Sequence, residues 1–169
     1  FIRRQRDAAM ADPDVTAIVY DVNSGGGEAA GCFELADESF ALRGTKPTIS
    51  VVDSACYSAA YALASTSDQV VVTPTGGAGS VGVYTMHVDM SKMLENWGLN
   101  ITLIHAGDHK VDGHPYAELP DDVRADMQKS VDATYNKFVE SVARNRNMSV
   151  EAVKATQARC YSADDALAL

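Results

Sequence analysis

The stretch PTISVVDSACYSAAYALASTSDQVVVTP, residues 47–74, contains the alternation from which the fold is predicted. Its beginning, PTISVVDS (47–54), is rich in β-branched residues and predicts a buried strand. The small residues of SAAYALASTS (58–67) predict a short helix, and QVVVTP (69–74) predicts a second strand. Two strands joined by a helix indicate a parallel pair and therefore an α/β fold.

The same alternation continues outward from this stretch. Upstream, VTAIVYDV (15–22) predicts a strand buried on both faces, followed by a helix from Glu28 to Arg43. Downstream, the pattern predicts four more elements: a helix at 90–98, a strand at 100–107, a long helix at about 120–146, and a last helix at 149–160. We therefore expect an α/β fold with a largely parallel sheet that is flanked by helices.

The length of 169 residues is typical of one domain with a real core, and we expect a single domain over 1–169. The sequence begins inside an apparent helix and ends at ADDALAL without a closing element, which predicts a fragment of a longer protein. No apolar run approaches the roughly 20 residues of a membrane span, and no signal peptide is visible.

The net charge of −9 argues against a nucleic-acid surface, which requires a basic stripe. The basic cluster Arg3, Arg4 and Arg6 is more simply a solvated helix turn. The three cysteines are Cys32, Cys56 and Cys160. They lack the spacing of a metal site, and their odd number opposes a disulfide framework. We expect no metal and no cofactor.

Three candidate nucleophiles, Ser54, Cys56 and Ser58, follow or end the strand at 47–54. Active sites of α/β sheets lie at the carboxyl ends of strands, and Ser58 also begins a helix, where backbone N–H groups favour negative charge. Ser58 can equally be a plain N-cap. Cys56 can be a buried small hydrophobe, and Ser54 a turn residue at the strand end.

The loop NSGGG (23–27) follows the strand at 15–22. Its N–H groups can form an oxyanion hole, although a simple strand-to-helix turn has the same composition. A phosphate loop is disfavoured because the run lacks the Gly-Lys-Ser/Thr ending of that motif.

A catalytic serine needs a base, and Lys110 and His87 are the rival candidates. His105, His109 and His114 are less well placed. Lysine serves as a base only where burial or cationic neighbours populate its neutral amine. Judged alone, Lys110 is more simply a solvated loop residue, so the base stays open at this point.

Three segments together resemble the signal peptide peptidase A family of serine proteases: DVNSGGG (21–27), ACYSAAYALASTSDQVVVTPTGGAGSVGV (55–83) and IHAGDHKVDGHPYAELPDDVRADMQKSVDATYNKFVESVARNR (104–146). The resemblance extends from about Ala17 to Leu167. AGDHKVDGHP is most similar to the branch of bacteriophage head maturation (capsid assembly) proteases. The resemblance implies a Clp protease/crotonase-like fold with repeated β-β-α or β-α units. It also implies that the family's first strand and its closing Gly-Leu-hydrophobic-Asp element are absent here.

The resemblance further implies a Ser-Lys dyad. Ser58 falls on the family's nucleophile, Lys110 on its general base, and Ser80 on the serine that hydrogen-bonds the lysine amine. Gly26 and Gly27 match the glycines of the oxyanion hole, and the N–H of Ala59 is the expected second donor. This sequence departs from the family at three positions: Gly25 replaces a proline, and Ala59 and Ala60 replace two glycines.

The implied function is a serine endopeptidase that works through an acyl-enzyme and cleaves phage scaffold or capsid proteins during prohead maturation. Relatives form rings or domes, so we expect a homo-oligomer with active sites near subunit interfaces, located in the host cytoplasm or prohead. The alternative is a cellular signal peptide peptidase that degrades remnant signal peptides and is membrane-associated through an anchor elsewhere in its chain. We expect no nucleic-acid partner.

Two further readings stay open. A Ser-His-Asp peptidase on the same fold could use His87 as its base, with Asp89 or another carboxylate orienting it. A crotonase-like acyl-CoA enzyme could use the glycine run as an oxyanion hole and would need no nucleophilic serine.

Overall fold

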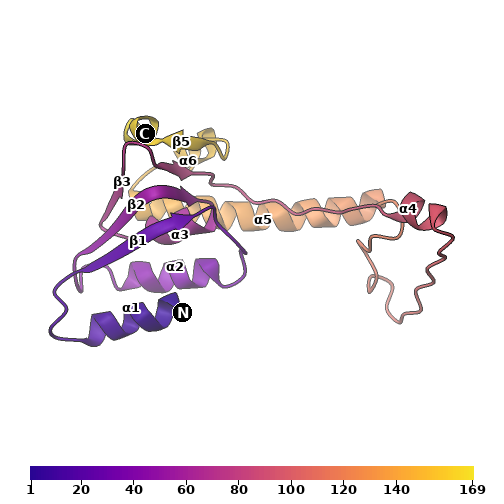
Figure 1. The fold of residues 1–169 in the computed structure, drawn as a ribbon, viewed down its shortest axis with the longest axis horizontal. Helices are drawn as coiled ribbons and strands as arrows, with labels where there is room; N and C mark the ends of the chain where they lie inside the picture. Colours follow the sequence, from indigo (N-terminus) through magenta and orange to yellow (C-terminus); the bar gives the residue numbers. More distant parts are fainter. The chain divides into compact units, whose positions relative to one another are not determined.

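The computed structural model describes residues 1–169, and its α/β architecture confirms the predicted fold class. The chain divides into two compact units. Unit 1 consists of Phe1–Val83 and Thr134–Leu169, and unit 2 consists of Tyr84–Ala133. All five strands lie in unit 1 and form one sheet, which is parallel except at its last strand (Figure 1).

Strand β2 (Thr48–Tyr57) is the centre of this sheet. On one side it pairs in parallel with β1 (Ile18–Ser24), and on the other with β3 (Gln69–Val72) and β4 (Gly77–Gly79). Strand β5 (Cys160–Ser162) then pairs antiparallel with β4.

The pairing changes in the middle of β2. Residues 49–52 pair with β3 and residues 55–57 with β4, while the register with β1 shifts between Val22 and Ser24. Between these halves, Asp53 and Ser54 are exposed. The predicted strand end at Ser54 was therefore wrong, because β2 bends there and continues to Tyr57.

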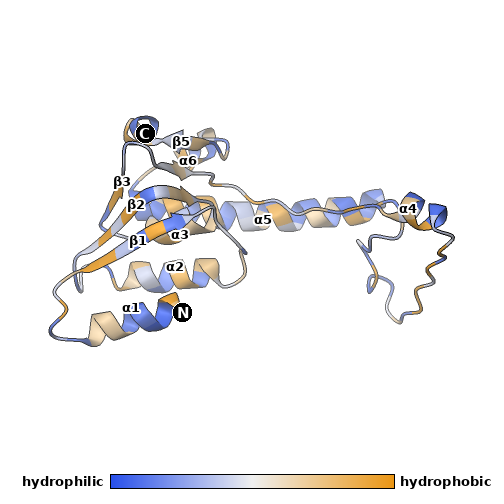
Figure 2. Cartoon of the chain, in the orientation of Figure 1, coloured by the Kyte–Doolittle hydropathy of each residue, from blue (hydrophilic) through white to orange (hydrophobic).

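Helices α2 (Cys32–Ala41) and α3 (Ala59–Ala64) pack against each other, and α3 also contacts β1 and β2. The final part of the long helix α5 (Asp121–Arg146) completes the main core through Phe138, Val139 and Val142. Figure 2 shows the hydrophobic residues of β1, β2 and β3 beside these helices. Burial of this apolar surface is the main favourable contribution to folding of unit 1.

Polar contacts fix the N-terminal helix against α2 and hold the start of β2. Arg6 of α1 (Ile2–Ala11) is only 4% exposed, and it forms ion pairs with Asp7 and with Glu38 of α2. At the start of β2, the N–H and hydroxyl of Thr48 both donate to Asp68 at 2.8 Å.

The C-terminal part differs from the single helix predicted at 149–160. Helix α6 (Val150–Ala155) has Ser149 as its N-cap, whose hydroxyl accepts from the Ala152 N–H, as expected. It ends early, and strand β5 and helix α7 (Ala163–Leu167) follow. Gln157 and Ala158 both have positive φ, which reverses the chain toward β4.

Unit 2 contains helix α4 (Ser91–Asn96) and the first half of α5. The segment 100–107, predicted as a strand, is not paired into any sheet. Its apolar side chains, including Ile101 and Ile104, are exposed. A β-ladder requires a partner strand, and no strand of this structure pairs with the segment. No helix, in either unit, has both the length and the apolar character needed to cross a bilayer.

We predict that Asp68 makes the stability of unit 1 sensitive to acid. Burial alone would raise the pKa of Asp68, but the hydrogen bonds from Thr48 and Arg43 outweigh this effect and lower its pKa. The stabilisation is therefore present above the ordinary Asp value of about 3.9 and is lost as pH falls through the lower folded pKa. Urea unfolding at pH 7 and pH 3 should show a smaller pH effect in Asp68→Asn than in wild type.

The matched control is Asp14→Asn, because the exposed Asp14 carboxylate has no side-chain partner. An Asp68→Asn variant with the wild-type pH dependence would contradict the role of Asp68.

Candidate active site

Ser58 lies directly between β2 and α3, as the N-cap of that helix. Its backbone has φ 53° and ψ −126°, a region that L-residues rarely occupy. Such a conformation costs about 1–3 kcal/mol and is found where the surrounding structure enforces it, often at functional sites. A sharp, strained strand-to-helix turn exposes the nucleophilic serine of α/β-hydrolases.

The side chain of Ser58 is half-buried and has no hydrogen-bond partner within the chain. It also makes no N-capping bond to the first turn of α3. The simple N-cap interpretation of this serine therefore lacks the hydrogen bond that defines a cap. The Ser58 Oγ is therefore not engaged by any group of the chain.

Gly26 packs directly against Ser58. A Cβ built on Gly26 would lie 2.6 Å from the Ser58 Cβ and 3.2 Å from its Oγ. Gly26 also has φ 112°, where side chains other than glycine are strained. The loop after β1 can approach the serine this closely only because this residue has no side chain.

The backbone N–H groups of Gly26, Gly27 and Ala59 were predicted as oxyanion donors. The Gly26 N–H donates to the Ser24 Oγ at 3.2 Å, whereas the N–H groups of Gly27 and Ala59 have no acceptor in the chain. The Ala59 N–H is one of the unsatisfied donors of the first turn of α3. Gly27 and Ala59 are therefore available to bind an anion, and Gly26 becomes available if Ser24 releases it.

Ser80 follows β4 as Ser58 follows β2. Tyr57 and Gly79 are paired in the parallel register, and the Ser58 N–H donates to the Gly79 carbonyl at 3.0 Å. The two serines thus leave the sheet at the same edge. Ser80 also has φ 53°, and its hydroxyl has no partner.

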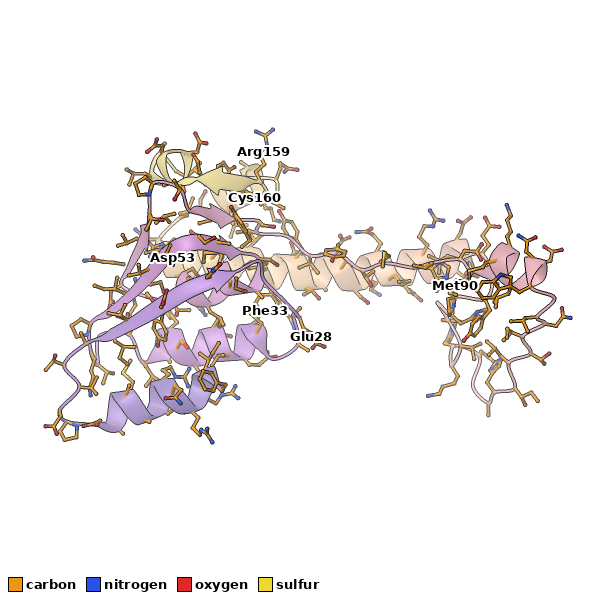
Figure 3. The ribbon with its side chains drawn as sticks, viewed as in Figure 1. Glu28, Phe33, Asp53, Met90, Arg159 and Cys160 are labelled. Atoms are coloured by element: carbon orange, nitrogen blue, oxygen red, sulfur yellow. The ribbon has the colours of Figure 1, made fainter.

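The surroundings of Ser80 reveal residues that sequence reasoning missed. The Ser80 N–H donates to the carbonyl of Arg159 at 2.8 Å, and Arg159 lies beside Cys160 at the start of β5 (Figure 3). A Cβ on Gly79 would meet the same carbonyl at 2.7 Å. Only the run of glycines before Ser80 signalled so close an approach of two backbones.

The other nucleophile candidates are unsuited to the role. The Cys56 side chain is fully buried, and this burial raises its pKa to about 12, so the thiol is protonated at neutral pH. Ser54 lies at the bend of β2, several residues before the turn. Burial likewise raises the pKa of Cys32, whose Sγ lies 3.6 Å from the Ala59 carbonyl oxygen.

Lys110 belongs to unit 2, where its side chain is exposed and has no ion pair or hydrogen bond. Its N–H donates to Gly107, and the next turn is closed by a 2.8 Å contact between His109 Nδ1 and Asp112. This hydrogen bond raises the pKa of His109. Because Ser58 and Lys110 lie in different units, their pairing stays a prediction.

His87, the rival base, is also in unit 2. Its Nε2 lies 3.0 Å from the carbonyl oxygen of His114, so this nitrogen donates to the backbone. Asp89 accepts from the Ser91 N–H instead of from His87. Hydrogen bonding from the side chain and then from the backbone of Ser91 lowers the pKa of Asp89. The His-Asp contact that a triad requires is therefore absent between these two residues.

Comparison with known proteins assigns the chain to a family. Residues 41–169 match the model of peptidase family S49. The chain is 42% identical over 153 residues to the head-tail preconnector protein GP5 of Enterobacteria phage P21, covering 90% of this chain and 30% of that protein. It is 40% identical over 159 residues to the capsid assembly protease C of Escherichia phage lambda, covering 94% and 36%. The chain therefore spans about a third of the length of these relatives.

Among solved structures, a 1510-N membrane-bound stomatin-specific protease shares the fold, with a TM-score of 0.62 and 14% identity. The match covers 99% of this chain and 68% of that one. The likeness shows a shared fold, and the family match confirms the resemblance predicted from the three sequence segments. The chain belongs to peptidase family S49.

Proposed function

We propose that this chain is the catalytic part of a serine endopeptidase whose nucleophile is Ser58. One observation carries the proposal: an unpartnered Ser58 Oγ stands on a strained turn, beside Gly26 and at the N-terminus of α3. A strand and a helix can be connected without backbone strain, so the fold alone does not require this turn. A strained turn is typical where a nucleophile is presented to a substrate. Membership of a peptidase family supports the same assignment.

In the proposed mechanism, the neutral amine of Lys110 removes the proton from Ser58 Oγ, which attacks the scissile carbonyl carbon. The resulting oxyanion accepts hydrogen bonds from the N–H groups of Gly27 and Ala59, joined by Gly26. The C–N bond then breaks, and the leaving amine takes the proton from Lys110. Lys110 next activates a water molecule that hydrolyses the acyl-enzyme and restores Ser58. Ser80 orients the lysine amine through its free hydroxyl.

The proposed substrates are scaffold or capsid proteins of a phage, which places the reaction in the host cytoplasm or prohead. The two phage relatives support this choice, since both are about 40% identical to the chain. The alternative is cleavage of remnant signal peptides by a cellular enzyme. The two alternatives are separated by incubating the protein with assembled proheads and, in parallel, with a set of signal peptides, and comparing which of them is cleaved.

We also propose that the active form is a homo-oligomer. Most of the exposed large apolar side chains of the protein belong to unit 2, including Tyr84, which is 88% exposed, Met86 at 74% and Ile104 at 96%. Exposed apolar side chains gathered in one unit favour an interaction site there. Contact with a second copy would cover these side chains, and would also bury Lys110, as a lysine base requires.

We predict that the dyad residues are indispensable and that His87 is not. Ser58→Ala and Lys110→Ala should each lower peptidase turnover by at least about 10³-fold. His87→Ala should retain the wild-type turnover, because its Nε2 is already bonded to a carbonyl. A fluorogenic peptide assay measures turnover, and a fluorophosphonate probe reports Ser58 directly.

Loss of activity in His87→Ala with retention in Lys110→Ala would establish the triad instead. Absence of any fluorophosphonate label on Ser58 would favour the acyl-CoA enzyme.

We predict that the closeness of Gly26 to Ser58 is needed for activity. Gly26→Ala places a methyl group within 3 Å of the Ser58 Cβ and of the Tyr57 carbonyl oxygen, so the serine must move. A displacement near 1 Å at a reacting atom costs about 10²-fold in rate, and labelling of Ser58 should slow accordingly. Gly25→Ala is the control, since a Cβ there meets nothing within 4 Å. Equal labelling of the two variants would show that this contact is unimportant.

We predict that one charge on the apolar surface of unit 2 disrupts assembly. Ile104→Asp should sediment as a monomer and lose peptidase activity, whereas Leu167→Asp should do neither. Leu167 is a matched control, since it is 88% exposed but belongs to unit 1. Analytical ultracentrifugation with a parallel activity assay tests this, and a fully active monomer would refute the oligomer proposal.

A further inference from the structure

A buried polar cluster lies at the C-terminal end of α3, the helix that begins beside Ser58. Ser65 is fully buried and Asn145, from the last turn of α5, is 2% exposed. The Asn145 Nδ2 donates to the Ser65 Oγ at 2.9 Å, and the Ser65 hydroxyl donates to the Ala62 carbonyl at 2.8 Å. All buried side-chain polar atoms here have partners. Such fully satisfied networks rigidify the core that contains them.

The cluster connects to Ser58 through one turn of helix. The Ala62 N–H donates to the Ser58 carbonyl at 3.0 Å, while the Ala62 carbonyl receives the Ser65 hydroxyl. Asn145, Ser65, Ala62 and Ser58 therefore form one chain of hydrogen-bonded residues. It leads from the end of α5 to the backbone of the strained serine.

Helix α3 needs this external support. It has six residues, far fewer than the roughly 12–15 at which an isolated helix becomes stable in water. Its first residue follows a backbone conformation that neighbouring structure must enforce. Asn145 is itself held in place by two further hydrogen bonds. Arg144 Nε donates to its side-chain Oδ1 at 3.1 Å, and Arg43 donates to its backbone carbonyl oxygen at 2.9 Å.

We infer that Asn145 is a positioning residue for the nucleophile, acting through Ser65 and helix α3. This inference rests on the proposed function, since it concerns the geometry of Ser58 during attack. Asn145 does not touch the substrate. Its amide holds the C-terminal end of α3, so that the strain at Ser58 cannot relax by a shift of this short helix.

The test compares Asn145→Ala and Ser65→Ala with Thr66→Val in the full chain. Thr66 is the matched control because it lies in the same buried turn, yet its hydroxyl donates only to Leu63 within the helix segment, at 2.7 Å. Asn145→Ala and Ser65→Ala should each lower kcat by up to about 10²-fold with KM unchanged. Because both break the same connection, the double variant should lose no more than the worse single variant. Thr66→Val should keep the wild-type kcat, and Ser65→Thr, which keeps the hydroxyl, should recover activity.

Thermal unfolding of all variants separates positioning from general destabilisation. The inference is refuted if Asn145→Ala keeps the wild-type kcat, or if Thr66→Val loses as much kcat at an equal loss of stability. Failure of the proposed function has a different signature. In that case Ser58→Ala retains activity, or wild-type Ser58 takes no fluorophosphonate label.

Discussion

The parallel pairing of β2 with β4 is the interaction on which the candidate site depends. Ala55–Tyr57 run beside Gly77–Gly79, and the hydrogen bond from the Ser58 N–H to the Gly79 carbonyl extends this register by one residue. Because parallel strands end at the same edge, Ser58 and Ser80 emerge side by side in the ladder. The glycines of β4 make this possible: a Cβ on Gly77 would overlap the Tyr57 hydroxyl, and one on Gly79 would meet the Arg159 carbonyl.

The strained conformation of Ser58 is supported from three directions. Gly79 accepts its N–H, Gly26 packs against its side chain, and Ala62 donates to its carbonyl. Each support acts on a different part of the residue, so the backbone cannot relax without breaking one of them. This is the condition under which a rare φ/ψ combination persists in a folded protein. Gly26 and Gly79 lack side chains because neighbouring backbones approach them closely.

The two units differ in how far they bury their apolar side chains. Unit 1 buries them in two clusters around β2, α3 and the end of α5. In unit 2 the alternating apolar residues, such as Tyr84, Met86 and Val88, remain exposed on an extended segment that no strand pairs with. An alternating pattern indicates one buried face, and nothing within unit 2 supplies the covering layer. The segment 100–107, predicted as a strand, is likewise exposed and unpaired.

Local sequence was sufficient for the α/β class, the strands near 15–22 and 69–74, and the N-cap at Ser149, because these depend on β-branched runs and on one hydroxyl at a helix start. It could not predict that β2 continues through its bend to Tyr57, or that β5 follows α6, since both depend on hydrogen bonds to β4, far away in the chain. The resemblance singled out Ser58, Gly26 and Ser80 by motif, but not how their backbones meet. That Ser24 holds the Gly26 N–H while Gly27 and Ala59 stay free follows from the folded loop alone. Residue type limits which hydrogen bonds are possible, and only the three-dimensional packing of distant segments selects among them.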